Sequence, residues 1–267
     1  MAITLNRSPL SRATGMVPNL FTVANMALGF FAIMAAIDNR WLTAPICIFV
    51  AHIMDILDGR VARWMGLSSQ FGGQFDSFAD WVSFGIAPAI MVYLLALKDF
   101  GKLGFLLAFF FVLCGALRLT RFNLKASEPA GASPSTSFSG LPIPGAGGFL
   151  AILVLLFGLS ESGHRGRTMF LLYQNVPHLL EAIPVIVFLL SLLMISKVEY
   201  STFKRTRLFR PQSLQALIIT LFGCFMIYAY PENTIFILYS GYILWGVINT
   251  SWRAYRLRIK PAEPTLK

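Results

Sequence analysis

The sequence contains few charged residues and very few acidic ones. Only 13% of its 267 residues are charged and only 12 are Asp or Glu, whereas 56% are hydrophobic and the mean hydropathy is +0.68. Charged residues make up about a quarter of a typical soluble domain. This composition therefore excludes a soluble globular domain and predicts a polytopic membrane protein.

Cysteine is scarce as well. The three cysteines, Cys47, Cys114 and Cys224, all fall within apolar segments and have neither paired nor metal-ligand spacing. We interpret them as small buried residues rather than as parts of a disulfide framework or a zinc site. The sequence also lacks an obvious internal repeat and any soluble segment between the apolar runs, which predicts one integral membrane domain over residues 1–267.

Apolar runs of about 20 residues, the length that a helix needs to cross a bilayer, recur along the chain. We therefore expect an all-α bundle of about eight transmembrane helices. The first run is long and lacks a convincing small-residue cleavage site, so it should be retained rather than removed as a signal peptide. The predicted spans cover residues 17–37, 42–63, 75–97, 103–123, 143–160, 180–196, 213–230 and 233–250.

The net charge of +10 is explained by where the basic residues lie. With both termini in the cytoplasm, 17 of the 22 Lys and Arg residues fall on the inner side and 5 on the outer side. This distribution satisfies the positive-inside rule, so the charge does not require a nucleic-acid partner. We expect a bacterial inner-membrane protein whose basic cytoplasmic tail, residues 251–267, could also attract anionic membrane lipids.

Four of the twelve acids lie in one 26-residue window, DILDGRVARWMGLSSQFGGQFDSFAD: Asp55, Asp58, Asp76 and Asp80. Carboxylates beside membrane-length apolar segments are costly and usually mark a functional site. Asp55 and Asp58 are i,i+3 and Asp76 and Asp80 are i,i+4, so each pair shares one helix face. Two such pairs on adjacent helices would form a cup of four carboxylates near the cytoplasmic surface.

Carboxylates gathered in this way must take up protons or bind cations. Their hard oxygen ligands suit Mg²⁺ or Mn²⁺, and shared carboxylates suit a pair of ions that holds phosphates during displacement. Small residues among the acids, Gly59, Ala62, Gly72 and Gly73, would let a ligand approach the backbone closely. Arg63 could pair with a diphosphate. A proton or cation pathway in a transporter is the alternative that these residues leave open.

Two other features have a structural and a functional interpretation. His52 lies three residues before Asp55 and could be a metal ligand, although a packing histidine is favoured because hard oxygen sites rarely need imidazole. The glycines of PIPGAGG, residues 142–148, could cradle a phosphate, although close helix packing is favoured.

The acidic window carries a more specific pattern. The string Asp55-x2-Asp58-Gly59-x2-Ala62-Arg63-x8-Gly72-x3-Asp76-x3-Asp80 resembles, without a departure, the signature of the CDP-alcohol phosphatidyltransferase family. The resemblance implies an integral membrane enzyme that transfers a substituted phosphoryl group from a CDP-linked donor to an alcohol and releases CMP.

The same resemblance implies roles for the residues of the signature. Asp55, Asp58 and Asp76 would ligate the metal ions, and Asp80 would help to hold them and act as general base on the attacking hydroxyl. The remaining residues would bind CDP-diacylglycerol: Gly59, Ala62 and Gly72 would make room for the cytidine diphosphate, and Arg63 would engage its phosphates.

The acceptor is indicated by three further segments, residues 17–30, 116–123 and 138–148, which resemble the branch of the family that uses L-serine. That branch makes phosphatidylserine from CDP-diacylglycerol, and a homodimer is also implied. Glycerol 3-phosphate, an inositol phosphate or choline remain alternative acceptors. Arg118 and Arg121, which are i,i+3, could neutralise the serine carboxylate, or could simply be topology-setting arginines at a helix end.

Overall fold

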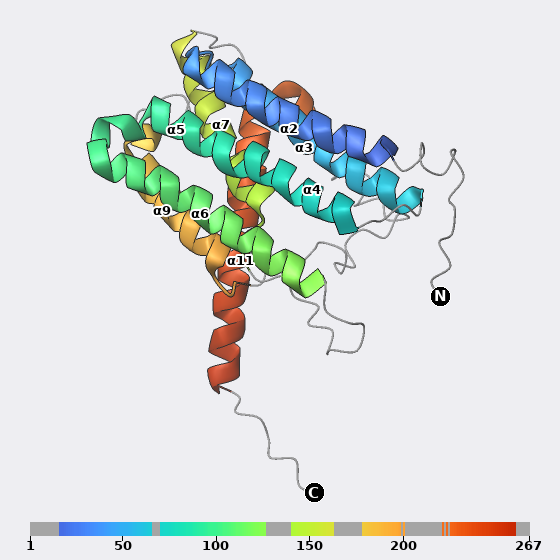
Figure 1. Ribbon diagram of the computed structural model, residues 1–267. Helices are drawn as coiled ribbons and strands as arrows, with labels where there is room; N and C mark the ends of the chain where they lie inside the picture. Colours follow the sequence, from blue (N-terminus) through green and yellow to red (C-terminus); the bar gives the residue numbers. More distant parts are fainter. Residues whose placement is uncertain are drawn as a thin grey trace, which may run out of the picture.

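The computed structural model describes residues 16–65, 70–126, 140–162, 178–198, 200, 221, 223 and 225–259. Every regular element within these ranges is helical, and the helices pack into one bundle (Figure 1). The elements are α2 (Met16–Ile37), α3 (Thr43–Trp64), α4 (Gln70–Asp80), the π-helical turn η1 (Trp81–Ile86), α5 (Ala87–Leu95), the 3₁₀ turn η2 (Leu97–Phe100), α6 (Gly101–Ala126), α7 (Ile143–Glu161), α9 (Ile183–Ile195) and α11 (Pro231–Ile259).

The prediction of an all-helical membrane protein is confirmed at this level. Among the described residues, five helical stretches are long and apolar enough to cross a bilayer. They agree in position with the first, third, fourth, fifth and eighth predicted spans. These stretches are Asn19–Ile37, Gln70–Leu95, Leu97–Leu124, Ile143–Glu161 and Pro231–Trp252.

The predicted number of eight spans is not reached, for three separate reasons. The second predicted span is the 22-residue helix α3, but it carries Asp55, Asp58, Arg60 and Arg63 and is too polar to count by composition. The sixth is α9, which has only 13 residues. The seventh, residues 213–230, lies largely outside the described part of the chain.

Helices α2 and α3 form an antiparallel hairpin that aligns them along most of their length (Figure 1). The turn between them places Asn39 in the left-handed region, with φ of 56°. Asn tolerates this conformation better than most residues because its short polar side chain can bond locally. The hairpin brings the polar residues of α2 against the acidic end of α3.

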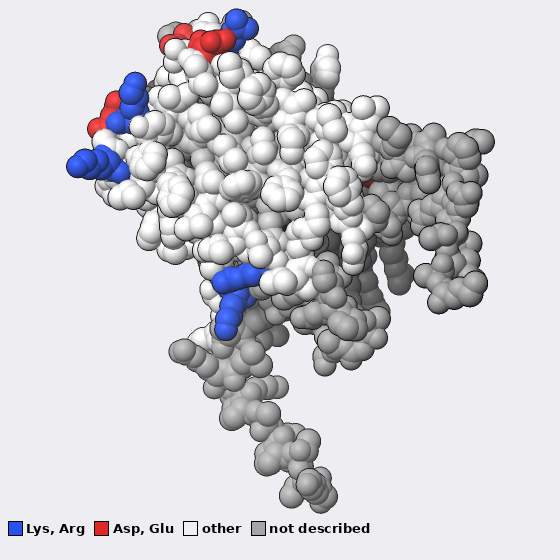
Figure 2. Space-filling view, viewed as in Figure 1, with Lys and Arg blue, Asp and Glu red and all other residues white. Residues whose placement is uncertain are grey.

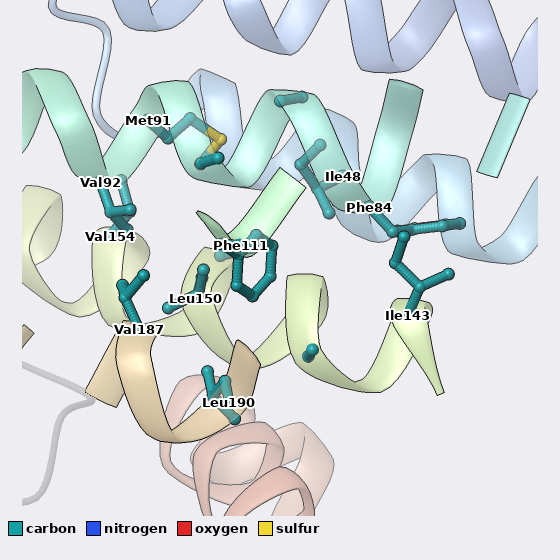
Figure 3. Close-up of a cluster of buried hydrophobic side chains, with 14 of the residues drawn as sticks. Ile48, Phe84, Met91, Val92, Phe111, Ile143, Leu150, Val154, Val187 and Leu190 are labelled. Carbon is teal, nitrogen blue, oxygen red and sulfur yellow. The ribbon is translucent and has the colours of Figure 1, made fainter. Parts of the chain in front are cut away.

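Helix α7 is the centre of the bundle. In its most apolar window 72% of the residues are buried, compared with 6% in the corresponding window of α11. A helix that is hydrophobic all round belongs in an interior, which agrees with the α7 sequence. Figure 3 shows side chains from α3, η1, α5, α6 and α9 gathered around Leu150 of α7, including Ile48, Phe84, Phe111 and Val187.

Helices α4 and α5 form one continuous rod through η1, which begins immediately after Asp80. Pro88 has no backbone N–H and so cannot donate to the carbonyl of Phe84 as an α-helix would require. The wider register of the π turn, in which Ala87 N donates to the carbonyl of Val82, precedes this interruption. Such π turns are frequent next to functional sites.

The surface agrees with insertion in a membrane. In Figure 2 the described Lys, Arg, Asp and Glu side chains lie mostly towards opposite ends of the molecule, and the broad surface between them is uncharged. Large apolar side chains are exposed on several helices, among them Phe30, Phe31, Phe105 and Phe109. In a bilayer this surface would contact lipid chains, so its exposure needs no protein partner.

Candidate active site

The acidic residues of the window come together across two helices. Asp55 belongs to α3, and Asp76 and Asp80 belong to α4. One carboxylate oxygen from each of these three residues lies within 4.8 Å of the others. The spacing of Asp76 and Asp80 puts both side chains on one face of α4, and α2 packs against both α3 and α4.

Asp58 lies beside this group of three rather than in it. Its side chain is only 6% exposed and accepts a hydrogen bond from the hydroxyl of Thr22. It also makes a side-chain hydrogen-bond contact with Asp76, which links it to the group. Two carboxylates at such close range cannot both stay ionised unless a cation lies beside them. All four acids therefore belong to one connected cluster.

Helix α2 supplies two residues that the sequence analysis missed. Thr22 bonds to Asp58, and the side-chain nitrogen of Asn25 donates to Oδ1 of Asp80 at 3.1 Å. Both residues are almost completely buried. A signal for them existed, because they are polar, i,i+3 and placed within an otherwise apolar run. What the run could not reveal was which carboxylates they would contact.

The cluster fits a divalent cation by its chemistry. Its ligands are carboxylate oxygens, which Mg²⁺ and Mn²⁺ prefer. Two buried oxygens have no hydrogen-bond partner in the part of the chain that the structure describes. They are Oδ1 of Asp76 and Oδ1 of Asn25, the residue that donates to Asp80. Unsatisfied oxygens next to grouped carboxylates are what a cation would bind. The three acids could thus hold a metal ion.

The residues expected to bind the donor lie along the same helix faces. Arg63 is exposed and curls back over Gly59, since a Cβ at that glycine would lie 3.5 Å from Nη1 of Arg63. Arg63 also interacts electrostatically with Asp58. Ala62 and Gly72 are half-buried, and Gly72 is one turn before Asp76. The structure therefore places the positively charged side chain of Arg63 and several small residues beside the acids.

A cavity of about 650 Å³ opens beside Asp55, between α3, the start of α7 and α11. Its walls are mostly apolar, and Asp55 provides a charged point in them. The volume is in the usual range for sites that bind small molecules. The lining residues are Phe49, His52, Ile53, Asp55, Pro142, Pro144, Gly145, Ile235, Leu238, Tyr239 and Tyr242.

His52 lines this cavity but does not belong to the group of side chains that could hold a metal ion. Its ring packs edge-on against Phe84, with 5.3 Å between ring centroids. The interpretation as a packing histidine is therefore favoured. The glycines of residues 142–148 also serve packing, because a Cβ at Gly147 would lie 2.9 Å from Cα of Phe84, and one at Gly148 would clash with the ring of Tyr239.

The two candidate arginines of α6 point to different places. Arg118 is partly buried and interacts electrostatically with Tyr242 and Asp80. Arg121 is exposed, and its Nη1 donates to the carbonyl of Ile195 at 2.9 Å. Tyr242 packs against Tyr200, with 5.3 Å between the ring centroids. Burial, with a smaller contribution from Tyr242, raises the pKa of Tyr200 to about 12, so this neighbour stays neutral.

Comparison with known proteins agrees with the geometry. A family model described as CDP-alcohol phosphatidyltransferase matches residues 15–190. The CDP-diacylglycerol–serine O-phosphatidyltransferase of Helicobacter pylori is 33% identical over 86% of the chain and 89% of its own length. That of Bacillus subtilis is 36% identical over 51% of the chain and 74% of its own length. The archaetidylserine synthase of Methanothermobacter thermautotrophicus is 39% identical over 48% of the chain and 53% of its own length.

Proposed function

This chain belongs to the CDP-alcohol phosphatidyltransferase family, and we propose that it transfers the phosphatidyl group of CDP-diacylglycerol to the hydroxyl of L-serine. The products are phosphatidylserine and CMP. The observation that carries the proposal is the convergence of Asp55, Asp76 and Asp80 beside an apolar cavity of about 650 Å³. The relatives from Helicobacter pylori and Bacillus subtilis, which are named for serine, support the choice of acceptor.

The site suits a donor such as CDP-diacylglycerol, in which a diphosphate joins a nucleoside to a lipid. Asp55 is shared between the acidic cluster and the apolar cavity, so a diphosphate held at the cluster would direct its attached glycerolipid into the cavity. There the acyl chains would meet Phe49, Ile53 and Leu238. Gly59, Ala62 and Gly72 leave room for the cytidine diphosphate, and Arg63 pairs with its phosphates.

Asp55, Asp58, Asp76 and Asp80 are the residues that would hold the cofactor, which we propose to be a pair of Mg²⁺ or Mn²⁺ ions. Bound ions would neutralise the charge of the diphosphate and stabilise the departing phosphate of CMP. Thr22 and Asn25 orient the carboxylates of Asp58 and Asp80, so that these side chains do not need to reorganise when substrate binds.

The transfer step exchanges one phosphorus–oxygen bond for another. The serine hydroxyl oxygen forms a bond to the lipid-linked phosphorus, and the bond from that phosphorus to the bridging oxygen of CMP breaks. The hydroxyl proton passes to Asp80, and the electron pair of the broken bond leaves with CMP. Asn25 donates to one oxygen of Asp80 and so fixes the orientation of this base.

We also propose that the protein resides in a bacterial inner membrane with its termini and site at the cytoplasmic face, where serine and CDP-diacylglycerol meet. The positive-inside distribution of Lys and Arg supports this orientation. The homodimer implied by the family resemblance remains a prediction.

The test is a panel of acceptors. Purified protein in lipid vesicles receives CDP-diacylglycerol, Mg²⁺ or Mn²⁺ and, in turn, L-serine, glycerol 3-phosphate, inositol 1-phosphate or choline, and CMP release is followed. We expect rapid release with L-serine. Faster CMP release with another alcohol would identify that alcohol, rather than serine, as the acceptor. No CMP with any of them would favour a transporter.

A further inference from the structure

We infer that His52 of α3 donates a hydrogen bond to an ester carbonyl of the donor lipid, and so selects a diacylglycerol donor over the matching dialkyl ether. This inference rests on the proposed function and deepens it, because it names a residue that determines specificity for the lipid half of the donor. The edge-on contact with Phe84 fixes where the His52 ring lies, but an aromatic face is only a weak hydrogen-bond acceptor. The hydrogen-bonding capacity of the imidazole is therefore available to a ligand.

One face of α3 forms a wall of the cavity along which polarity falls. Asp55, His52 and Phe49 follow one another at three-residue intervals, and all three line the cavity. Each interval advances about 4.5 Å along a helix axis. Starting from the acidic cluster, the wall thus presents a carboxylate, then an imidazole and then a phenyl ring.

CDP-diacylglycerol changes in the same order along its length. Its diphosphate is followed by a glycerol with two ester carbonyls, and then by acyl chains that have no polar group. The nearer ester is attached to the carbon next to the one that bears the phosphate. With the diphosphate held at the cluster that includes Asp55, this ester would lie about one helical turn further along α3, beside His52.

The imidazole of His52 has an unused polar group. Its Nδ1 is buried and has no hydrogen-bond partner among the described residues. A neutral imidazole carries an N–H on one nitrogen and a lone pair on the other. Because an enclosed N–H without an acceptor is costlier than an enclosed lone pair, the proton belongs on Nε2. From there it can be donated to a carbonyl oxygen in the cavity.

The two tyrosines of the cavity are directed elsewhere. The hydroxyl of Tyr239 lies directly against Gly148 of α7, and Tyr242 interacts electrostatically with Arg118. This leaves His52 as the polar side chain of the described cavity wall that could meet an ester.

A lipid can reach His52 from the bilayer. Ile53 and Leu238 line the cavity from α3 and α11, and they are 53% and 60% exposed. The cavity therefore opens between these two helices on the apolar surface of the bundle. A donor lipid could enter there with its chains still in the membrane, whereas a water-soluble ligand would have to cross hydrocarbon.

The test compares two donors that differ only in the ester carbonyls, CDP-dipalmitoylglycerol and its dihexadecyl ether analogue. L-serine-dependent CMP release is measured in mixed micelles for wild-type protein, His52→Phe, His52→Leu and His52→Gln. We expect wild-type protein to prefer the ester about tenfold in kcat/KM, since the ether leaves an enclosed donor without an acceptor. His52→Phe keeps a ring against Phe84 and should lose most of this preference, through a higher KM for the ester alone. His52→Gln keeps an N–H donor and should retain it.

Phe49→Leu is the matched control. It shortens an apolar side chain of the same wall, so it should weaken both donors by the same factor and leave their ratio unchanged. The metal concentration for half-maximal CMP release should stay within about twofold in the His52 variants, because loss of a metal ligand or of its support would raise it about tenfold or more.

Four results would overturn the inference. They are equal use of both donors by wild-type protein, an unchanged preference for the ester in His52→Phe, equal losses with both donors in that variant, and a tenfold rise in its metal requirement. If His52→Phe does not yield folded protein, the ratio of ester to ether use in His52→Leu decides in the same way. Absence of serine-dependent CMP release from either donor in wild-type protein would instead reject the proposed function.

Discussion

At the scale of single residues, the acidic cluster shows what spacing can and cannot predict. The i,i+3 and i,i+4 intervals within the window predict that all four aspartates face one another, and the structure groups Asp55, Asp76 and Asp80, with Asp58 beside them. They could not predict that Thr22 and Asn25 would bond to the cluster, because this depends on which face of α2 packs against α3 and α4. The sequence therefore shows which side chains share a helix face, but it does not show which residues of another helix pack against that face.

The clearest residue-scale prediction concerns Asp76→Asn. Asn has nearly the same shape but no charge, so the fold should persist while the site loses a cation ligand. We expect CMP release to fall by more than about 100-fold, because even groups that only orient metal ligands cost up to about that much when removed. The measurement is the rate of CMP release as Mg²⁺ or Mn²⁺ is varied, with Asp55→Asn as a parallel case. Near-normal rates would reject the metal assignment.

Thr22→Val tests the support of Asp58. Val replaces the hydroxyl with a methyl group of similar size, so the buried carboxylate of Asp58 loses a hydrogen bond without a change in packing volume. We expect the metal concentration for half-maximal CMP release to rise about 10- to 100-fold. Thr22→Ser keeps the hydroxyl and is the matched control. Equal metal dependence in both variants would show that this bond does not orient the site.

At the scale of elements, the positions of most helices could be predicted, but the π turn could not. Apolar length located α2, α6 and α7, whereas Pro88 interrupts the α-helical hydrogen bonds but does not by itself specify a π turn, whose residues Ser83 and Phe84 are also closely packed by neighbouring helices. Gly29 of α2 approaches Ser83 from one helix, and Gly147 of α7 approaches Phe84 from another. Both contacts lie in the turn that follows directly after Asp80. Such contacts join residues far apart in the chain and leave no periodic pattern.

Gly29→Ala should therefore disturb both stability and activity. The added Cβ would lie 2.7 Å from Cα of Ser83, so α2 and η1 would have to separate. We expect a loss of about 1–3 kcal/mol in unfolding free energy, as for other overpacked interiors, and a lower rate of CMP release. Thermal unfolding in detergent and the CMP assay measure the two effects.

Gly241→Ala is the matched control for this change, because a Cβ on that residue of α11 would have open space around it. Since Ala favours helix over Gly, this control should be neutral or slightly stabilising. If Gly29→Ala unfolded at the same temperature as Gly241→Ala, with full activity, the close approach of α2 to η1 would have no energetic importance.

At the scale of the whole molecule, the distribution of charged residues predicts the orientation of the protein across the membrane, which the helices alone do not define. The uncharged belt between the charged ends in Figure 2 fits the hydrocarbon layer but is the same for either orientation. Lys and Arg break this symmetry, since 17 of 22 fall on the side predicted to face the cytoplasm. The acids of the proposed site lie in the half of α3, and in the half of the continuous rod from Gln70 to Leu95, that is nearer residues 66–69, and this half would then face the cytoplasm.

Single cysteines at Asp99 and Gln70, placed in protein whose Cys47, Cys114 and Cys224 are changed to Ala, test this orientation. Both positions are exposed: Asp99 lies in η2 between α5 and α6, and Gln70 begins α4 at the end nearer the proposed site. Because a rod from Gln70 to Leu95 is long enough to cross the bilayer, the two positions should lie on opposite sides. In intact spheroplasts, a membrane-impermeant maleimide should label Asp99→Cys and should label Gln70→Cys only after lysis. Labelling in the reverse order would place the acidic cluster outside the cytoplasm and away from its proposed substrates.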